Sequence, residues 1–503
     1  MRIKATGGQS ARLDHKAINQ FKNVRIEKKI EANRQMLDEM FQDSSDVIIR
    51  DFQIENGPKA IIFFVDGLVT SSSIDQALKS LMVLEGDART VEQVFMQTLP
   101  VGQSVKVNYY SDMLVNVLSG DTGLFIDGND SAICMGLRGG QRRSVSEPET
   151  EAVVRGPREG FNEHLRTSTG LIRSKIKSPR LKMKSFYIGT ETNTNVVLAY
   201  MAGIANPKLI EEAEKRLNAI HIDGILESGY IEELIQDKPN ALFAQLQNTE
   251  RPDTVAASLL EGRIAIIVDG TPFVLLAPFG FLQWLQASED YYERFVIGSL
   301  LRILRLIALF IALLAPALYI AVSTFHPEMF PSILLLSIAT SREAIPFPAV
   351  VEALIMEFAF EALREAGIRL PKTVGQAVSI LGALVVGQAA VQAGIVSAAM
   401  VIVVSMTGIA SFTLPRYSSA ISIRLLRFPL MVIASVFGLL GIIIGVMAIV
   451  FHMAKITSFG VPFLAPLSPI NVSDLKDTLI RAPWWKMKRR PSYLNPEDQR
   501  RQR

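Results

Sequence analysis

Two apolar stretches decide the fold of this chain: LIALFIALLAPALYIAVSTF at residues 306–325 and PLMVIASVFGLLGIIIGVMAIVFHM at residues 429–453. Each is long enough to cross the hydrocarbon core of a bilayer, which needs roughly 20 apolar residues in a helix. A soluble core helix of this length and apolarity is uncommon. We therefore predict a membrane protein, and we expect residues 429–453 to form its last span.

The apolar excess is confined to the C-terminal half of the 503 residues. The chain is 49% hydrophobic and 20% charged, with a net charge of +3, so about three hundred residues of mixed sequence precede the first apolar stretch. The N-terminus is basic and lacks an apolar signal region, which places this polar head in the cytoplasm. The single cysteine, Cys134, excludes an intramolecular disulfide and a cysteine-built metal site and fits a reducing compartment.

The head contains the same pattern twice. A helical stretch, an apolar strand, an Asp-Gly turn and a returning strand occur around Asp127-Gly128 and again around Asp269-Gly270. A glycine also follows an early strand in each half, at Gly67 and Gly203. We predict two related α/β subdomains; the alternative is that any two α/β units share this much.

The predicted fold class is an α/β soluble head of two related subdomains followed by an α-helical transmembrane domain. The expected boundaries are a charged extension at 1–45, subdomains at 46–137 and 185–290 with a basic connector at 138–184 between them, a helical domain at 291–455 and a tail at 456–503.

The connector stands apart because Lys and Arg outnumber Asp and Glu by 12 to 5 over residues 138–184. Ser146 and Glu149 have the spacing of a helix capping box. One interpretation is a basic surface for anionic lipid headgroups. The other is a solvated linker helix whose charges confer solubility.

No motif for nucleotide, serine-hydrolase or zinc-protease chemistry occurs: GxxxxGK[ST], GxSxG, HExxH and a GxGxxG after a strand are all missing from the sequence. The five histidines are scattered without ligand spacing. The Asp-Gly pairs are better explained as turns than as ligands of a metal ion or a nucleotide. We predict no enzymatic activity, no cofactor, no metal site and no nucleic-acid partner.

Basic residues suggest the orientation of the helices. Arg302 and Arg305 precede the first span on the side of the head, and residues 324–330 contain no Lys or Arg, so the head is expected inside. A loop at 415–428 with Arg416, Arg424 and Arg427 and the basic tail are also expected inside. The head and the basic tail cannot both lie inside if the chain crosses the membrane an odd number of times. Either residues 331–339 do not span, or the Pro-rich residues 461–470 re-enter the membrane.

One predicted helix, residues 350–367, carries acidic residues among apolar ones. Glu357 and Glu361 share a face, while Glu352 lies opposite. The helix could lie flat at the interface with a wet acidic face. Alternatively, these carboxylates could line a water-filled cation path, because ionisable residues at membrane depth often mark ion routes.

Two further spans, residues 373–391 and 395–412, are expected to form a hairpin with its turn at residues 392–394. One face of the first is rich in small residues, which suits close helix packing. The opposite face suits a pore that gates by dewetting, if several copies surround an axis; the alternative is a lipid-facing stripe. The candidate pore-lining residues on that face are Val378, Leu381, Val385, Gln388 and Gln392.

The connector sequence RSVSEPETEAVVRGPREGFNE at residues 143–163 resembles the signature of the GerA family, the A-type subunits of bacterial spore germinant receptors. The resemblance continues through DGTPFVLLAP at 269–278, SEDYY at 288–292, IPFPAVVEALIME at 345–357 and VGQAAVQAG at 386–394. It covers nearly the whole chain. The signature residues are Ser146, Glu147, Pro148, Glu149, Arg155, Gly156, Pro157, Arg158, Glu159, Phe161, Asn162 and Glu163.

The resemblance implies a multi-pass protein of the spore inner membrane with its head in the spore core. It implies a transporter-like B subunit and a lipoprotein C subunit as partners, with the nutrient bound mainly by B. It further implies that A subunits form homo-oligomers, as pentamers, which make a nutrient-gated channel for monovalent cations whose opening starts germination. With this implication, the stripe at residues 378–392 becomes the favoured pore lining.

Two alternatives stay open. The related A-type subunit of the operon for dipicolinate channels shares these motifs and would amplify germination. A non-conducting membrane scaffold, whose head relays a signal to other membrane proteins, requires only surfaces and no pore.

Overall fold

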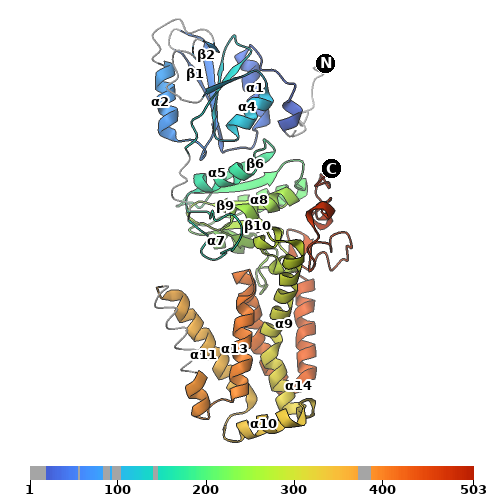
Figure 1. Cartoon of the computed structure of the whole chain (residues 1–503). Helices are drawn as coiled ribbons and strands as arrows, with labels where there is room; N and C mark the ends of the chain where they lie inside the picture. The colour runs from blue at the N-terminus through green and yellow to red at the C-terminus, as the bar shows by residue number, and fades with distance from the viewer. Residues whose placement is uncertain are drawn as a thin grey trace.

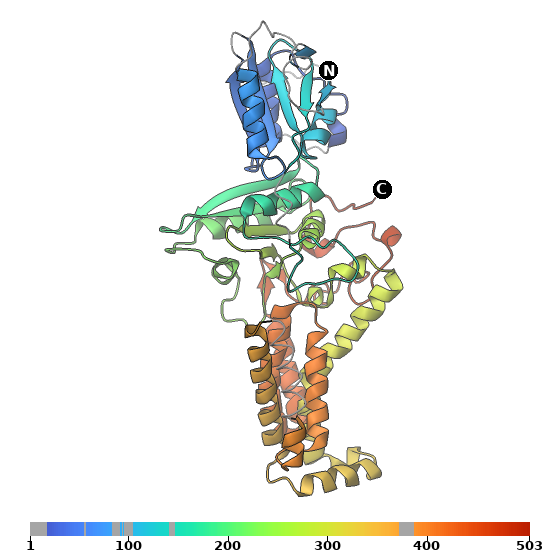
Figure 2. The same cartoon turned by 60° about the vertical axis from the view of Figure 1, so that its left-hand side comes forward.

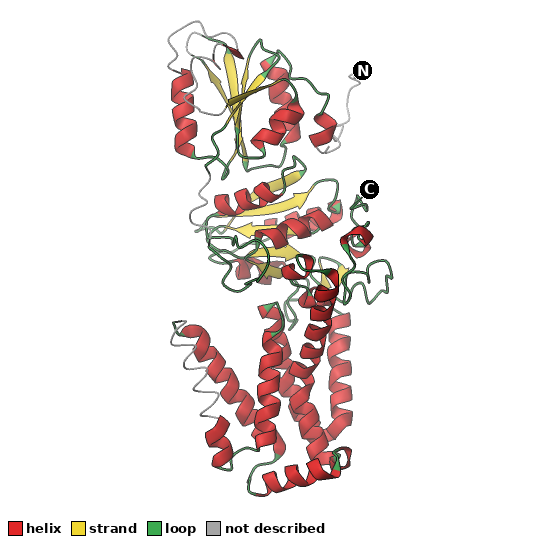
Figure 3. Ribbon diagram, in the orientation of Figure 1, coloured by secondary structure: helices red, strands yellow, loops and turns green. Residues whose placement is uncertain are grey.

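The head consists of two subdomains stacked above a helical bundle (Figures 1 and 2). The computed structural model describes residues 18–54, 57–82, 91, 92, 94, 104–139, 146–371 and 387–502. Figure 3 shows that the strands are confined to the upper two thirds and that helices make up the lower third. The predicted division into an α/β head and a C-terminal helical region with apolar helices is therefore confirmed.

The first subdomain is one antiparallel sheet with helices on both faces. Its strand order is β1-β2-β4-β5-β3. Leu37 and Tyr110 pack with Phe63 on one face, whereas Ile74 and Leu78 pack on the other. Its elements are α1 (Ile30–Met40), β1 (Val47–Gln53), β2 (Lys59–Val65), α2 (Ser71–Met82), β3 (Ser104–Val107), α4 (Tyr110–Val117), β4 (Thr122–Ile126) and β5 (Ala132–Met135), after a 3₁₀ turn η1 (Ile18–Phe21).

The second subdomain repeats this architecture. Its antiparallel sheet has the order β6-β7-β9-β10-β8, so the strands hold the same places as in the first sheet. Successive residues Val196 and Val197 enter the cores on opposite faces, as a strand buried on both sides requires. Its elements are α5 (Leu165–Lys175), β6 (Leu181–Ile188), β7 (Thr194–Met201), α6 (Pro207–Asn218), α7 (Ser228–Ile235), β8 (Gln247–Thr249), α8 (Pro252–Glu261), β9 (Ile264–Val268) and β10 (Val274–Ala277).

The two Asp-Gly turns show that the repeat includes the helix before each sheet. Asp127 accepts a hydrogen bond from the backbone N–H of Ile30 at the start of α1, at 3.1 Å, and Asp269 accepts one from Leu165 at the start of α5, at the same distance. An acidic side chain at a helix N-terminus satisfies free N–H groups there. The structure thus assigns α1 and α5 to the subdomains, although the expected boundaries at 46 and 185 begin after them.

The two subdomains are joined by a buried ion pair. The Arg173 guanidinium contacts both carboxylate oxygens of Asp46 at 2.8 Å, and the two side chains are 0% and 4% exposed. Beside them, Lys182 donates to the carbonyl oxygen of Met40 at 2.8 Å. Burial lowers the pKa of Lys182 to about 8, and the nearby Arg173 charge lowers it further. Both bonds cross between the first subdomain and the segment expected to be a connector.

Two helices are long and apolar enough to cross a membrane, α9 (Phe295–Phe325) and α14 (Tyr417–Ala454). The others in the described part of the bundle are α10 (Ser332–Glu343), α11 (Ala349–Arg369) and α13 (Ala398–Phe412). At 12 residues, α10 is about 18 Å long, and it lies across the end of the bundle far from the head (Figures 1 and 2). Residues 331–339 therefore do not run the length of the bundle.

α14 is two antiparallel arms, residues 417–437 and 439–454, and not the single last span predicted from hydropathy. Gly438 lies between them at φ 61° and ψ −140°, a conformation essentially restricted to glycine. Across the arms, a Cβ added to Gly441 would lie 2.5 Å from the carbonyl oxygen of Ile433, a contact impossible in a straight helix. Hydropathy cannot detect this reversal, because the apolar run at residues 429–453 continues through the turn without a charged residue. The tail then packs back onto the second subdomain through β11 (Thr457–Ser458), β12 (Val461–Pro462), η6 (Trp484–Lys486) and η7 (Ser492–Leu494).

Candidate functional site

A buried cluster of opposite charges joins the bundle helices. Arg427 of the first α14 arm contacts Glu357 of α11 at 2.9 Å, and both side chains are 0% exposed. The same guanidinium reaches Glu361 at 3.3 Å, and Arg424 approaches Glu361 at 3.4 Å. Arg364 lies between the rings of Phe360 and Phe412, at 4.8 and 4.6 Å. The cluster fixes α11 against α13 and α14, because a buried charge is costly unless it is paired.

Glu352 forms a second buried contact at the other end of α11. Its carboxylate accepts a hydrogen bond from the backbone N–H of Ser397, at 2.8 Å, where α13 begins. Arg342 at the end of α10 lies 3.4 Å from the same carboxylate, which is 0% exposed. Glu352 therefore holds the starts of α11 and α13 together.

These positions change the interpretation of the acidic helix. A flat interfacial helix with a wet acidic face is wrong for Glu352 and Glu357, because neither is exposed. The three candidate carboxylates each have an arginine partner, so they present little uncompensated negative charge to a passing cation. The expected loop at 415–428 is also wrong, because α14 begins at Tyr417 and both Arg424 and Arg427 lie within it.

The candidate pore stripe is only partly within the described residues. Val378, Leu381 and Val385 lie outside them. Gln388 and Gln392 are both exposed on a helical stretch that ends at the expected turn, where Gly394 has φ +65°. The structure thus places the two glutamines on an open surface of the single chain.

The connector forms an irregular layer over the second subdomain. Residues 146–163 contain no helix, so the predicted capping box of Ser146 and Glu149 is wrong. The backbone N–H of Glu149 donates instead to the carboxylate of Glu250, at 2.7 Å. Of the signature residues, Pro148, Phe161 and Asn162 are buried and Pro157 is half-buried. The other signature residues are exposed: Ser146, Glu147, Glu149, Arg155, Gly156, Arg158, Glu159 and Glu163.

Several contacts tie this layer to the rest of the protein. Glu151 forms an ion pair with Arg416 at the start of α14. Gly156 has φ +143°, and a Cβ there would lie 2.7 Å from the ring of Tyr292, just before α9. Glu159 pairs with Lys175 of α5 at 2.9 Å, whereas Arg158 pairs with Glu147 within the layer at 3.2 Å. The expected solvated linker helix is likewise not observed, because α5 buries Leu171 and Ile172 in the subdomain core.

The start of α9 is held by charges from three segments. Asp290, 0% exposed, contacts Arg302 at 3.0 Å and Arg305 at 2.8 Å. Arg302 also contacts Asp477 of the tail at 2.8 Å. The sequence indicated Arg302 and Arg305 only as a basic flank on the side of the head; in the structure Arg302 is fully buried. No sequence pattern identified Asp290 and Asp477 as the partners of these arginines, because the paired residues are not at a regular helical spacing.

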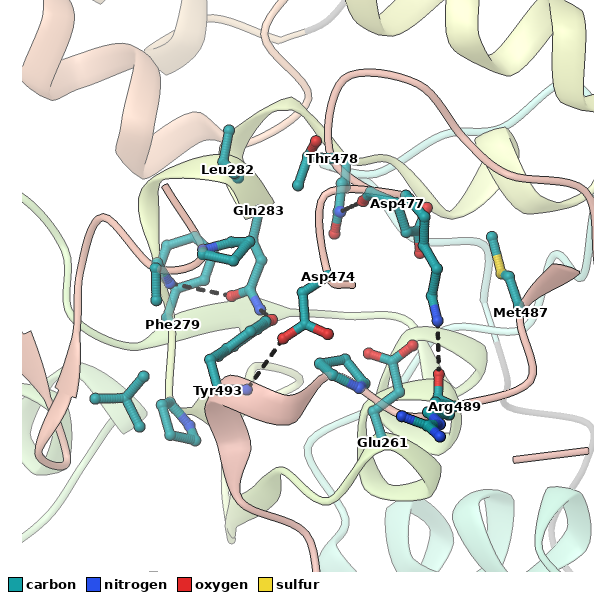
Figure 4. A pocket seen from close by; sticks show the side chains of 18 of the residues that line it. Glu261, Phe279, Leu282, Gln283, Asp474, Asp477, Thr478, Met487, Arg489 and Tyr493 are labelled. Carbon is teal, nitrogen blue, oxygen red and sulfur yellow. Dashed lines mark hydrogen bonds between the residues drawn. The ribbon is translucent and has the colours of Figure 1, made fainter. Parts of the chain in front are cut away.

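The tail closes over the second subdomain and encloses a cavity of about 60 Å³ (Figure 4). Glu261 and Gln283 come from the head, and Asp474, Asp477 and Tyr493 come from the tail. Asp474 accepts hydrogen bonds from the backbone N–H and the hydroxyl of Ser492, at 2.8 and 2.7 Å. The head, the start of α9 and the tail therefore form one packed junction, and the described residues contain no cluster suited to a metal ion.

Known proteins resemble this chain over almost its full length. The family described as Bacillus/Clostridium GerA spore germination protein matches residues 35–493. The uncharacterized membrane protein YfkQ of Bacillus subtilis is 52% identical, over 93% of this chain and 91% of that protein. Spore germination protein KA of Bacillus subtilis is 48% identical, over 91% and 85%, and spore germination protein B1 of the same organism is 38% identical, over 95% and 100%.

Among solved structures, the N-terminal domain of the A subunit of the Bacillus megaterium spore germinant receptor GerK3 matches 51% of this chain and 97% of that chain, with 36% identity and a TM-score of 0.40. The family match covers far more than half of the residues, and several relatives above 30% identity are covered over most of their length. The chain therefore belongs to the GerA family of spore germination proteins.

Proposed function

We propose that this chain is the A subunit of a spore germinant receptor, and that copies of it assemble into a nutrient-gated cation channel in the spore inner membrane. The observation that carries this proposal is the family match over residues 35–493, together with relatives named as spore germination proteins. B and C subunits would be its partners, with the nutrient bound mainly by B. A pentamer is the assembly that the family resemblance implies.

The arrangement of the helices supports a membrane domain with head and tail on one side. Both ends of α14 lie at the head, where Arg416 pairs with Glu151 and the Lys455 carbonyl accepts from Lys238. The reversal at Gly438 lies at the far end, against Phe325 of α9. With head and tail on the same side, the chain would cross the membrane an even number of times. The basic head flank and the basic tail could then both lie inside. The basic tail then lies inside with the head, as the positive-inside rule requires.

We assign the pore to the stripe that includes Val385, Gln388 and Gln392. Gln388 and Gln392 are exposed in the single chain, so both are free to face an axis shared by several copies. In an oligomer, a ring of valine side chains next to rings of glutamine amides would form a constriction that opens when water enters it. The buried carboxylates of α11 would position the neighbouring helices and would not conduct.

Potassium efflux from liposomes that contain the purified full-length protein tests this proposal. Val385→Ala widens the proposed constriction and Gln388→Leu makes it more apolar. We expect faster efflux with the first and slower efflux with the second. Ile443→Ala, on an exposed face of α14, is the matched control and should leave efflux unchanged.

The alternatives predict different results. A scaffold would give no efflux for any variant, although spores with Glu151→Gln or Arg416→Gln would still fail to germinate. An A-type subunit of the dipicolinate system would leave nutrient-triggered potassium release normal when its gene is deleted and would slow dipicolinate release instead.

A further inference from the structure

A second cavity, of about 150 Å³, lies at the junction of head, helices and tail. Its walls include Gln247 of β8, Arg263 before β9, Tyr291 before α9, Arg416 before α14 and Arg501 of the tail. Glu261 and Gln283 line both this cavity and the one in Figure 4, so the two are neighbours.

Three of the residues that line this cavity each have a buried side-chain nitrogen donor without a hydrogen-bond partner in the part of the chain that the structure describes. The donors are Nε2 of Gln247, Nη2 of Arg263 and Nε of Arg416. The three residues are only 3%, 4% and 8% exposed. Buried polar groups without a partner are rare and costly, so such a group often marks a bound molecule or water.

Arg263 is the most unusual of the three, because no carboxylate among the described residues lies within ion-pair distance of its guanidinium. Its Nε donates to the Pro278 carbonyl at 2.8 Å, and its Nη1 donates to Gln247 Oε1 at 3.0 Å and to the Ser258 hydroxyl at 3.1 Å. Burial lowers the pKa of Arg263 to about 10; the charge of Glu261 opposes this shift, and the positive charge of Arg416 adds to it. The guanidinium is still charged at neutral pH.

The acidic groups that face the cavity are already paired. Asp253 contacts Arg251 at 2.8 Å and accepts from the Tyr292 hydroxyl. Glu261 contacts Arg501 at 3.1 Å. Arg416, which also lines the cavity, pairs with Glu151. With these partners included, four arginines face three carboxylates, and the positive charge in excess is that of Arg263. The missing component is therefore an anion.

We propose that this cavity binds a small molecule that carries a carboxylate. A carboxylate accepts two or more hydrogen bonds and suits the planar guanidinium of Arg263 with the Gln247 amide beside it. The rest of the molecule would lie against Tyr291, Tyr292 and Trp484, which also line the cavity. The bound carboxylate would connect the head, through Arg263, with the first α14 arm, through Arg416. This binding does not depend on whether the protein conducts ions.

Binding can be measured with the full-length protein in detergent. The probes are sodium acetate and sodium butyrate; acetamide and butyramide are neutral controls of the same shape, and sodium chloride controls for ionic strength. Inorganic phosphate tests whether any small anion suffices. Trp484 lines the cavity and is one of only three tryptophans, so intrinsic fluorescence reports occupancy. The thermal unfolding midpoint provides a second readout.

Gln247→Glu is the decisive variant. It keeps the shape of the side chain and places a carboxylate beside Arg263, so it imitates the bound probe. We expect it to raise the midpoint without added probe and to weaken acetate and butyrate binding by about tenfold or more. Gln53→Glu makes the same chemical change on the exposed side of β1 and should leave binding unchanged.

Saturable binding of the carboxylates with no response to the amides, lost in Gln247→Glu, would support the proposal. A response to phosphate as strong as to the carboxylates would overturn the assignment of a carboxylate. No saturable response to either carboxylate would overturn the site itself and leave a cavity that holds only water. A lower midpoint in Gln247→Glu would also contradict it, since Arg263 would then not lack a negative partner.

Discussion

Arg427 in the first arm of α14 and Glu357 in α11 form an ion pair of 2.9 Å with neither side chain exposed. The residues are 70 positions apart, and Thr407 of α13 donates to the same Glu357 oxygen at 3.3 Å. Three helices thus meet at one carboxylate.

Glu357→Gln should destabilise the bundle, because it leaves the buried Arg427 with the longer contact to Glu361 alone. Breaking one partner of a buried pair costs about 3–5 kcal/mol. The thermal midpoint in detergent should fall clearly, whereas Glu365→Gln in an exposed pair of the same helix should change it little. Glu357→Leu with Arg427→Leu should recover most of the loss. A double variant as unstable as the single one would show that packing, and not the unpaired charge, is responsible.

Asp290→Asn should loosen α9 from the head, because one carboxylate neutralises both Arg302 and Arg305. We expect faster proteolysis of the tail, since Asp477 depends on a correctly placed Arg302. Limited proteolysis of the purified protein measures this. Glu293→Gln, whose partner Arg155 lies 3.8 Å away, is the control. Equal cleavage rates for both variants would be evidence against a shared junction.

Gly438→Ala should impair folding of α14, because φ 61° with ψ −140° is strained for any residue with a Cβ, at a cost of about 1–3 kcal/mol. Such a Cβ would also lie 3.1 Å from the ring of Phe325. The yield of monodisperse protein and the thermal midpoint should both fall. Gly387→Ala meets its nearest neighbour at an ordinary 3.5 Å and should be tolerated. If Gly438→Ala behaved like Gly387→Ala, α14 would have to be continuous.

Lys182 should make stability depend on pH. Its pKa is about 8 in the folded protein and about 10.5 when exposed, so the unfolded chain holds more protons between these values. Stability contributed by this residue therefore rises from pH 8 to pH 10.5, by up to about 3 kcal/mol, and is constant below pH 8. Unfolding of wild type and Lys182→Met across this range measures the effect. Wild type should gain stability relative to Lys182→Met as the pH rises from 8 to 10.5; relative to Lys184→Met, at a partly exposed pair, it should show no such trend.

The sequence predicted the parts of the fold that depend on local patterns. Asp127-Gly128 and Asp269-Gly270 form the expected turns between paired strands, and the two sheets share one strand order. The reversal at Gly438 was missed, because an apolar run has no hydropathy change where it turns. The partners of Glu352 and Glu357 could not be predicted either, since ion pairs across the bundle depend on helix packing and not on spacing along the chain.

The tail contact to Arg302 also fixes an order of events during synthesis. Asp477 lies 175 residues after Arg302 and is translated when all bundle helices have already been made. Until then, Arg302 has only Asp290 as an acidic partner among the described residues. A segment that is translated after the described bundle helices thus completes the junction, so a chain truncated before residue 477 would contain these helices and still lack the contact of Arg302 with the tail.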